Sequence, residues 1–161
     1  MKDIRMMVKV FQYGLIVLLM SFLVSCNKEQ IEKFDEPFVH IMQNNQDRIV
    51  VNTNRRDVVS YYIYYSTHKN NEDLEVTYSI NPGDGLQEGR DYQLLTNENP
   101  LLFPSGIYRR PIQIRWLNRR VENNLDNTLS IIIESTNKDD VNIGLPGPFN
   151  YQSEFIIEKT N

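Results

Sequence analysis

The sequence predicts an all-β protein built as a two-layer antiparallel sandwich, and three observations support that fold class. The 161 residues include no alanine, the best helix former, but 16 isoleucines, which are β-branched and favour strands. Short apolar or alternating runs are separated by clusters of Asn, Gly, Pro and Asp, without a helical period. The segment 38–161 is also long enough for one domain rather than two. We therefore expect a single sandwich over residues 38–161.

Nine apolar runs provide the expected strands. Each run has four to ten residues and ends at a turn signal, such as Asn44-Asn45 or residues 82–85 (PGDG). In chain order, the predicted strands are 38–43, 48–52, 58–67, 74–81, 91–95, 100–103, 108–117, 128–135 and 151–159. Alternation is clearest in 108–117, where Ile112, Ile114 and Trp116 share one face, which we expect to be the core face.

The first 25 residues predict a cleaved signal peptide. Positive side chains within residues 1–10 precede an uncharged, mostly apolar run over 14–24, which is too short to span a hydrocarbon core. The run ends in Leu23-Val24-Ser25-Cys26, which resembles the bacterial lipobox. This resemblance implies a covalent lipid on Cys26, followed by a polar tether, so that residues 26–37 link the membrane to the domain. Cys26 is the only cysteine in the sequence, so no disulfide is expected.

Residues beside the cysteine bear on location. Asn27 stands where an inner-membrane retention signal often has Asp, so we expect transfer to the outer membrane. The acidic Glu32, Asp35 and Glu36 resemble the export segments of Bacteroidota surface lipoproteins. We therefore expect a lipid-anchored protein at the cell surface, with the periplasmic face of the outer membrane left open.

Charge and motifs argue against two classes of function. Without the leader the chain carries 14 basic and 20 acidic side chains, a formal net charge of −6. This acidity and the export signal argue against nucleic acid as a partner. The sequence has no His-Glu-x-x-His, no Gly-x-Ser-x-Gly and no phosphate-cradling glycine loop. We therefore expect no enzyme activity and no catalytic residues.

From about Asp73 to Lys159 the chain resembles the Calx-beta and Calx-beta-like domains of Bacteroidota surface lipoproteins. The motifs that carry the resemblance are VTYSI at 76–80, DG at 84–85, GRDY at 89–92, LFPSG at 102–106, IQI at 112–114 and TLSI at 128–131. The resemblance implies an Ig-like sandwich of about seven to nine strands. It also implies a corner at Gly89, in which Asp91 accepts amide hydrogen bonds and Tyr92 buries its ring, and a Gly106 turn between paired strands.

Calcium is the first ligand that this resemblance suggests, because Calx-beta domains can bind it with acidic loops. A calcium ion needs six to eight oxygen ligands. The acidic run of the family after the strand at 112–116 is here LNRR (117–120), whose arginines would repel a cation. Asp139 and Asp140 are the best remaining candidates, and solvated acidic turns are the simpler interpretation. We expect no metal and no cofactor other than the lipid on Cys26.

Tyrosines on the 58–67 strand suggest direct glycan binding. Alternation sends Tyr61 and Tyr65 to one face and Tyr62 and Tyr64 to the other, so one pair must face away from the core. Exposed rings can act as stacking platforms for sugars, and Tyr62 and Tyr64 are the candidate contacts on this strand. Tyrosine is also a favoured cross-strand residue on a half-exposed sheet, so a structural role remains open.

A cluster of arginines lies nearby in the sequence, against the acidic balance of the chain. Its members are Arg109, Arg110, Arg115, Arg119 and Arg120. They could meet an anionic glycan or an acidic partner, or they could mark an edge strand that resists aggregation and pairs with local acids. The sequence therefore predicts a non-enzymatic binding or scaffold module for an unidentified envelope protein, in a glycan-uptake or adhesion system. Direct carbohydrate binding and a calcium-dependent module are the alternatives.

Overall fold

Ten strands make up the part of the chain that the computed structural model describes, residues 36–161. They are β1 (Phe38–Ile41), β2 (Arg48–Asn52), β3 (Val58–Ser66), β4 (Leu74–Pro82), β5 (Tyr92–Leu94), β6 (Leu101–Phe103), β7 (Arg109–Trp116), β8 (Thr128–Thr136), β9 (Asn142–Ile143) and β10 (Glu154–Thr160). The all-β prediction is confirmed, and each of the nine predicted runs overlaps one of these strands, although β4, β8 and β10 each extend one residue beyond the predicted run. The two-residue β9 was not predicted.

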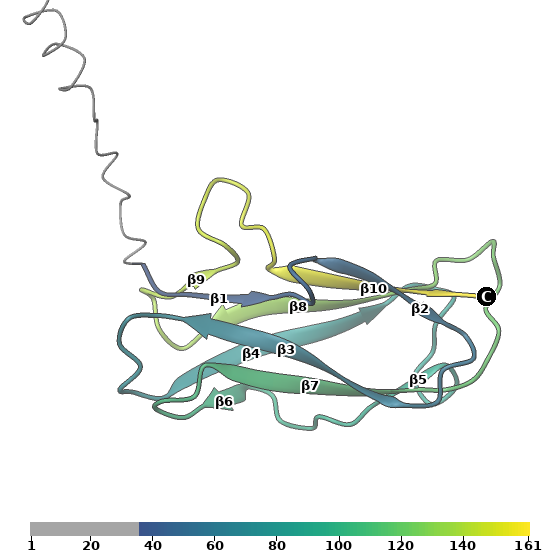
Figure 1. Cartoon of the computed structure of the whole chain (residues 1–161), viewed down its shortest axis with the longest axis horizontal. Helices are drawn as coiled ribbons and strands as arrows, with labels where there is room; N and C mark the ends of the chain where they lie inside the picture. The colour runs from purple at the N-terminus through teal and green to yellow at the C-terminus, as the bar shows by residue number, and fades with distance from the viewer. Residues whose placement is uncertain (1–35) are drawn as a thin grey trace, which may run out of the picture. The chain divides into compact units, whose positions relative to one another are not determined.

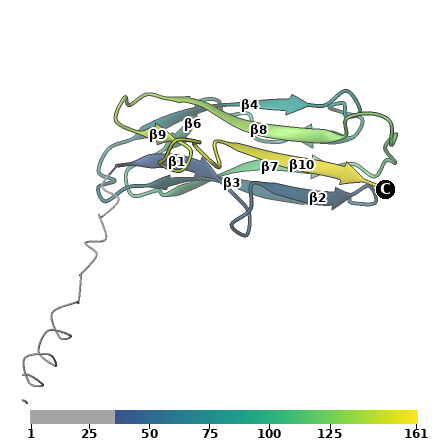
Figure 2. The same ribbon diagram turned by 90° about the horizontal axis from the view of Figure 1, so that it is seen from above.

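The strands form two five-stranded sheets that pack face to face. Sheet 1 has the order β5-β7-β3-β1-β9, and sheet 2 has the order β2-β10-β8-β4-β6. The described chain enters at the end of the sandwich that holds β9, and its C-terminus lies at the opposite end (Figures 1 and 2). Within residues 36–161 no helix is long and apolar enough to cross a membrane.

Both terminal segments of the domain change sheets, which makes the sheets mixed rather than purely antiparallel. The chain leaves β1 in sheet 1, turns through Asn44 and Asn45 at positive φ, and continues as β2 in sheet 2. The last segment does the same, with β9 in sheet 1 and β10 in sheet 2. These two segments run side by side in the same direction, so β1 pairs parallel with β9 and β2 pairs parallel with β10.

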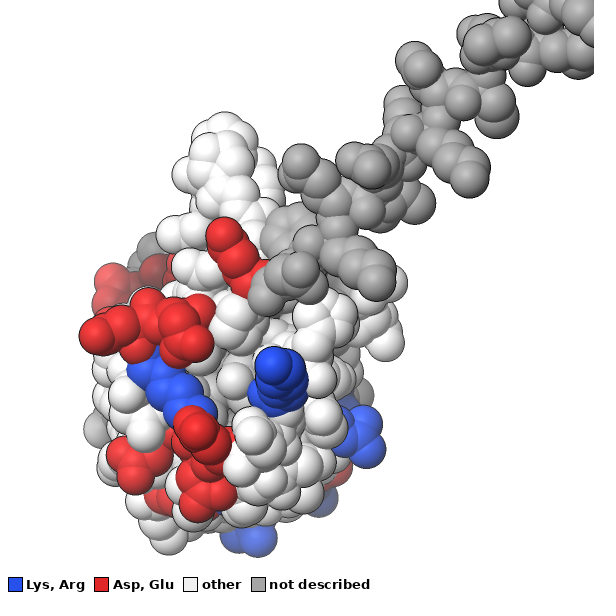
Figure 3. Space-filling view, turned by 90° about the vertical axis from the view of Figure 1, so that its left-hand side faces the viewer, with Lys and Arg blue, Asp and Glu red and all other residues white. Residues whose placement is uncertain are grey.

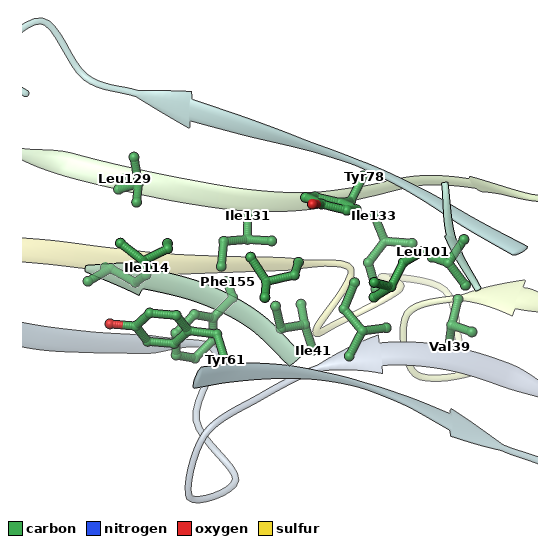
Figure 4. Close-up of a cluster of buried hydrophobic side chains, with 14 of the residues drawn as sticks. Val39, Ile41, Tyr61, Tyr78, Leu101, Ile114, Leu129, Ile131, Ile133 and Phe155 are labelled. Carbon is green, nitrogen blue, oxygen red and sulfur yellow. The ribbon is translucent and has the colours of Figure 1, made fainter. Parts of the chain in front are cut away.

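The core lies between the sheets and follows the predicted alternation. Ile112, Ile114 and Trp116 are fully buried, and the indole N–H of Trp116 donates to the Tyr61 hydroxyl at 3.0 Å. Figure 4 shows how inward side chains of both sheets meet, with Tyr61 near Phe155. Burying such side chains stabilises the fold by roughly 25 cal/mol per Å² of apolar surface.

Two local predictions are wrong because strand order differs from chain order. Gly106 has a positive φ of 82°, but β6 and β7 belong to different sheets, so its turn is a crossover and not a hairpin. The arginine-bearing β7 is also not an edge strand, because β5 and β3 flank it. The predicted corner is confirmed: Gly89 has φ of 80°, and Asp91 accepts the Gln87 amide at 3.0 Å.

Candidate functional site

Aromatic side chains form a row across the outer face of sheet 1. Tyr61 and Tyr65 are buried in the core, so β3 presents Tyr62 and Tyr64 outward, where they are half-buried. Their ring centroids lie 6.2 Å apart. The guanidinium of Arg109, on the neighbouring β7, lies 5.0 Å from the Tyr62 ring centroid, a cation–π contact. Three of the predicted contact residues are therefore brought together.

The row continues onto β1 through two residues that the sequence did not single out for binding. His40 is the register partner of Tyr64, and their rings stack at 5.4 Å and 20°. Phe38 lies 5.2 Å from His40, measured between ring centroids. Burial lowers the pKa of His40, which favours the neutral imidazole. We call Phe38, His40, Tyr64, Tyr62 and Arg109 the outer stripe.

The remaining predicted arginines lie away from the outer stripe. Arg115 also faces outward but is six residues along β7 from Arg109, about 20 Å at strand rise. Its guanidinium donates to the side-chain oxygen of Gln93 at 3.2 Å. Arg119 and Arg120 are exposed in the loop after β7, and Arg119 Nε lies 3.8 Å from a carboxylate oxygen of Asp91. The arginine cluster is thus split between two ends of the sandwich.

Arg110 is the one arginine of the cluster that turns toward the space between the sheets. It donates to the Leu102 carbonyl and forms an ion pair with Glu98 at 2.6 Å. The pairing with a local acid that the sequence suggested is therefore present at this position. Arg109 is therefore the one member of the arginine cluster that contacts the aromatic rings of the outer stripe.

A buried charged cluster lies at the end of the sandwich opposite the entry of the chain. The Lys159 side chain is 0% exposed, and its ammonium donates to the backbone carbonyls of Asp91 at 3.1 Å and Leu117 at 2.9 Å. It lies 4.0 Å from the Asp91 carboxylate and 5.9 Å from the Trp116 ring centroid. Asp91 also accepts from Arg90 Nε at 2.6 Å. Burial lowers the pKa of Lys159, while Asp91 opposes that change.

The sequence analysis missed this cluster, although a signal for it exists. Phe155, Ile157 and Lys159 alternate along β10, and the first two face the core. A lysine at the next inward position predicts a buried ammonium that needs oxygen acceptors. Asp91 and the Leu117 carbonyl supply these oxygen acceptors. The cluster therefore stabilises this end of the sandwich, and we interpret it as structural.

Asp139 and Asp140 lie exposed in the turn between β8 and β9. Asp140 lines a cavity of about 530 Å³ together with Glu72, Lys138 and Tyr65. Lys138 and Glu72 form an ion pair at 3.0 Å across this cavity. Among the described residues, no group of three or more His, Cys, Asp or Glu is placed to hold a metal ion.

The signal peptide, Cys26 and the tether up to residue 35 lie outside the described residues. No protein-family model matches the chain, and no curated protein matches it. The lipobox and the Calx-beta resemblance stay predictions that rest on the residues quoted above.

Proposed function

We propose that the protein is a non-enzymatic binding module, held to the outer membrane by a lipid on Cys26, whose outer stripe contacts another envelope protein. The observation that carries this proposal is the row of four rings and one guanidinium on the outward face of three neighbouring strands. His40 is only 6% exposed and supports the rings of Phe38 and Tyr64, so the contact surface is formed by the other members of the row. Core packing needs apolar residues on the inward face alone. Tyrosine and arginine are also the residues that most often dominate protein interfaces.

The way the rings pack favours a protein partner over a sugar. One face of Tyr62 lies under the Arg109 guanidinium, and one face of Tyr64 stacks on His40. A sugar ring that stacks needs an open aromatic face, whereas a protein surface can use ring edges, phenol hydroxyls and the arginine together. The row is also pre-organised by its own contacts, so little side-chain entropy is lost on binding.

Direct carbohydrate binding is the second candidate, because Tyr62, Tyr64 and Arg109 converge on one face as that hypothesis requires. An arginine beside two tyrosines can donate to hydroxyl or carboxylate oxygens of an anionic glycan. In this case Arg109 has to swing off the Tyr62 ring, which costs about 0.5–1 kcal/mol at an exposed site.

The protein-partner proposal is tested by photo-crosslinking in cells that express the full chain. A photoreactive phenylalanine in place of Tyr64 should give a discrete adduct with one envelope protein. The same amino acid in place of Val58 is the matched control, because Val58 lies on the same face of β3 at its far end and is 42% exposed. Equal adducts from both positions, or none from position 64 in protein that reaches the membrane, would refute the proposal.

The glycan candidate has a separate test. Electrophoresis of the wild-type protein through gels containing envelope or host polysaccharides should show retention, and Tyr62→Ala with Tyr64→Ala should abolish it. Arg115→Ala is the control, since Arg115 lies outside the outer stripe. A wild-type protein that migrates equally with and without every polysaccharide excludes this candidate.

The lipid anchor is tested on its own. Cys26→Ser removes the thiol that would carry the lipid, so the variant should leave the membrane fraction while the wild type stays in it. Metabolic labelling with an alkyne fatty acid should mark the wild type alone. A variant that remains membrane-bound contradicts the anchor.

A further inference from the structure

The loop between β9 and β10 carries two of the three most exposed large apolar side chains among the described residues. Phe149 is 72% exposed and Tyr151 is 59% exposed, and their ring centroids lie 5.5 Å apart. The loop projects away from both sheets in Figure 1. Residues 144–153 (GLPGPFNYQS) contain no charged side chain, although 24% of the whole chain is charged.

The loop has a closed neck that fixes how the rings are presented. The Leu145 amide donates to the Tyr151 carbonyl at 2.6 Å. Asn150 and Gln152 both adopt positive φ, 45° and 63°, a conformation that costs about 1 kcal/mol or more for residues with a side chain. Gly144 is packed so closely that an added Cβ would lie 2.3 Å from the Asn150 carbonyl oxygen. The exposed pair is therefore held in place by the backbone.

The root of the loop adjoins the point where the tether enters the domain. The Pro37 carbonyl accepts from the Asn142 amide at 2.9 Å, just before the loop begins. The Val39 carbonyl accepts from Gly144 at 2.8 Å, and the Ile41 amide donates to Gln152 at 2.8 Å. Both ends of the loop are therefore hydrogen-bonded to β1, the first strand after the tether. Pro37 lies eleven positions after Cys26, and this stretch of chain spans at most about 40 Å at full extension.

We propose that Phe149 and Tyr151 insert into the interfacial region of the bilayer that holds the lipid of Cys26. This inference rests on the proposed anchor. Both residues suit the membrane interface on an uncharged, projecting loop: the amphipathic tyrosine ring sits at headgroup level, and the apolar phenylalanine ring enters the boundary between headgroups and acyl chains. In Figure 3, which views the end of the sandwich where the chain enters, the lobe projecting at the top is uncharged, while acidic and basic side chains gather below it.

Apolar contact is the mode of membrane binding that fits the charges. Residues 36–161 carry 17 acidic and 12 basic side chains, so anionic lipid would repel the domain as a whole. Two rings alone bind a bilayer weakly. The lipid anchor raises their effective concentration at the membrane, so a weak contact is enough to orient the domain.

The test uses the full lipidated chain reconstituted into zwitterionic phosphatidylcholine vesicles, with Phe149→Trp as the reporter. The native Trp116 is buried, so the wild type supplies the baseline emission. The new tryptophan should emit at shorter wavelength in vesicles and be quenched by phosphatidylcholine brominated near the headgroup, with no dependence on salt. Val58→Trp is the control, because Val58 is exposed at the start of β3, far from the strand end that pairs with β1. Tyr151→Trp repeats the measurement at the second ring.

Each outcome separates the loop from the anchor. Quenching at positions 149 and 151 but not at 58 supports insertion. A protein that floats with the vesicles but shows no quenching at 149 or 151 overturns the insertion and leaves the anchor in place. A blue shift without quenching by brominated lipid means that the rings dock on protein, and it also overturns the proposal. A chain that carries no lipid and does not float overturns the anchor itself.

Discussion

Asp91→Asn should destabilise the protein by about 3 to 5 kcal/mol at pH 7, although the side chain keeps its shape. The Lys159 ammonium is 0% exposed and lies 4.0 Å from the Asp91 carboxylate. Two unit charges at that distance interact by about 4 kcal/mol at an effective dielectric constant of 20. Removing one partner of a buried pair costs about 3 to 5 kcal/mol, because the other charge stays buried and uncompensated. This loss is a large share of the free energy of unfolding of a typical protein, which is about 5 to 15 kcal/mol.

The loss should shrink as the pH rises. Burial lowers the pKa of Lys159, so the unfolded chain binds this proton more tightly than the folded one. Stability that depends on Lys159 therefore increases as pH rises through its folded pKa toward the unfolded value. Without Asp91, the folded pKa drops further, and Lys159 discharges at lower pH than in the wild type. The free-energy difference between variant and wild type should thus be larger at pH 7 than near pH 10.

Urea unfolding followed by Trp116 fluorescence measures this difference, since Trp116 is the only tryptophan and lies beside Lys159. Comparing the variant with the wild type at each pH cancels the titration of the tyrosines. Lys159→Met is the companion variant. It should cost less than Asp91→Asn, because Asp91 keeps Arg90 and the Gln87 amide as partners. A loss below 1 kcal/mol at pH 7, or a loss that does not change with pH, refutes the reasoning.

Three further predictions concern other parts of the described domain. Tyr61→Phe leaves the buried indole N–H of Trp116 without its acceptor and should cost about 1–3 kcal/mol in urea unfolding; a change within 0.5 kcal/mol contradicts this. Burial also raises the pKa of Tyr61 to about 12, so the wild type should lose stability as pH rises from about 10 to 12, and this part of the alkaline loss should be missing in Tyr61→Phe. Gly144→Ala should lower the free energy of unfolding by about 1–3 kcal/mol more than Gly106→Ala. Both glycines have φ of 82°, but only at position 144 would an added Cβ meet backbone atoms, those of the Asn150 carbonyl. Equal shifts in melting temperature for the two variants would argue against that close contact.

The strands were predictable where one face is buried, because apolar residues then recur at every second position of the sequence. Ile112, Ile114 and Trp116 show this period over enough residues to define a face, and all three are buried. The two-residue β9 is too short to carry a period. Its position comes from pairing with β1, a partner about 100 residues away in the chain. The parallel pairs escaped prediction for the same reason, since sheet switching depends on which strands become neighbours.

The candidate site was predictable within one strand but not across strands. Alternation alone grouped Tyr62 with Tyr64 on one face, and the burial of Tyr61 and Tyr65 in the structure shows that this face is the outward one. The neighbours of these tyrosines depend on strand pairing and register. His40 meets Tyr64 only because β1 pairs with β3, and Arg109 reaches Tyr62 only because β7 pairs with β3. The arginines do not form one cluster in the structure, although they are close in sequence. An 8-residue strand and the loop after it carry them to different ends of the sandwich.

One short strand connects the proposed anchor, the outer stripe and the aromatic loop. β1 begins directly after Pro37, contributes Phe38 and His40 to the outer stripe, and binds both ends of the loop. The proposed lipid on Cys26 and a tether of at most about 40 Å would keep the β1 end of the outer stripe close to the bilayer. Insertion of Phe149 and Tyr151 would shorten that distance further. A partner for the outer stripe must then reach near the membrane surface, which favours an envelope protein over a freely diffusing one and makes crosslinking in intact cells the decisive experiment.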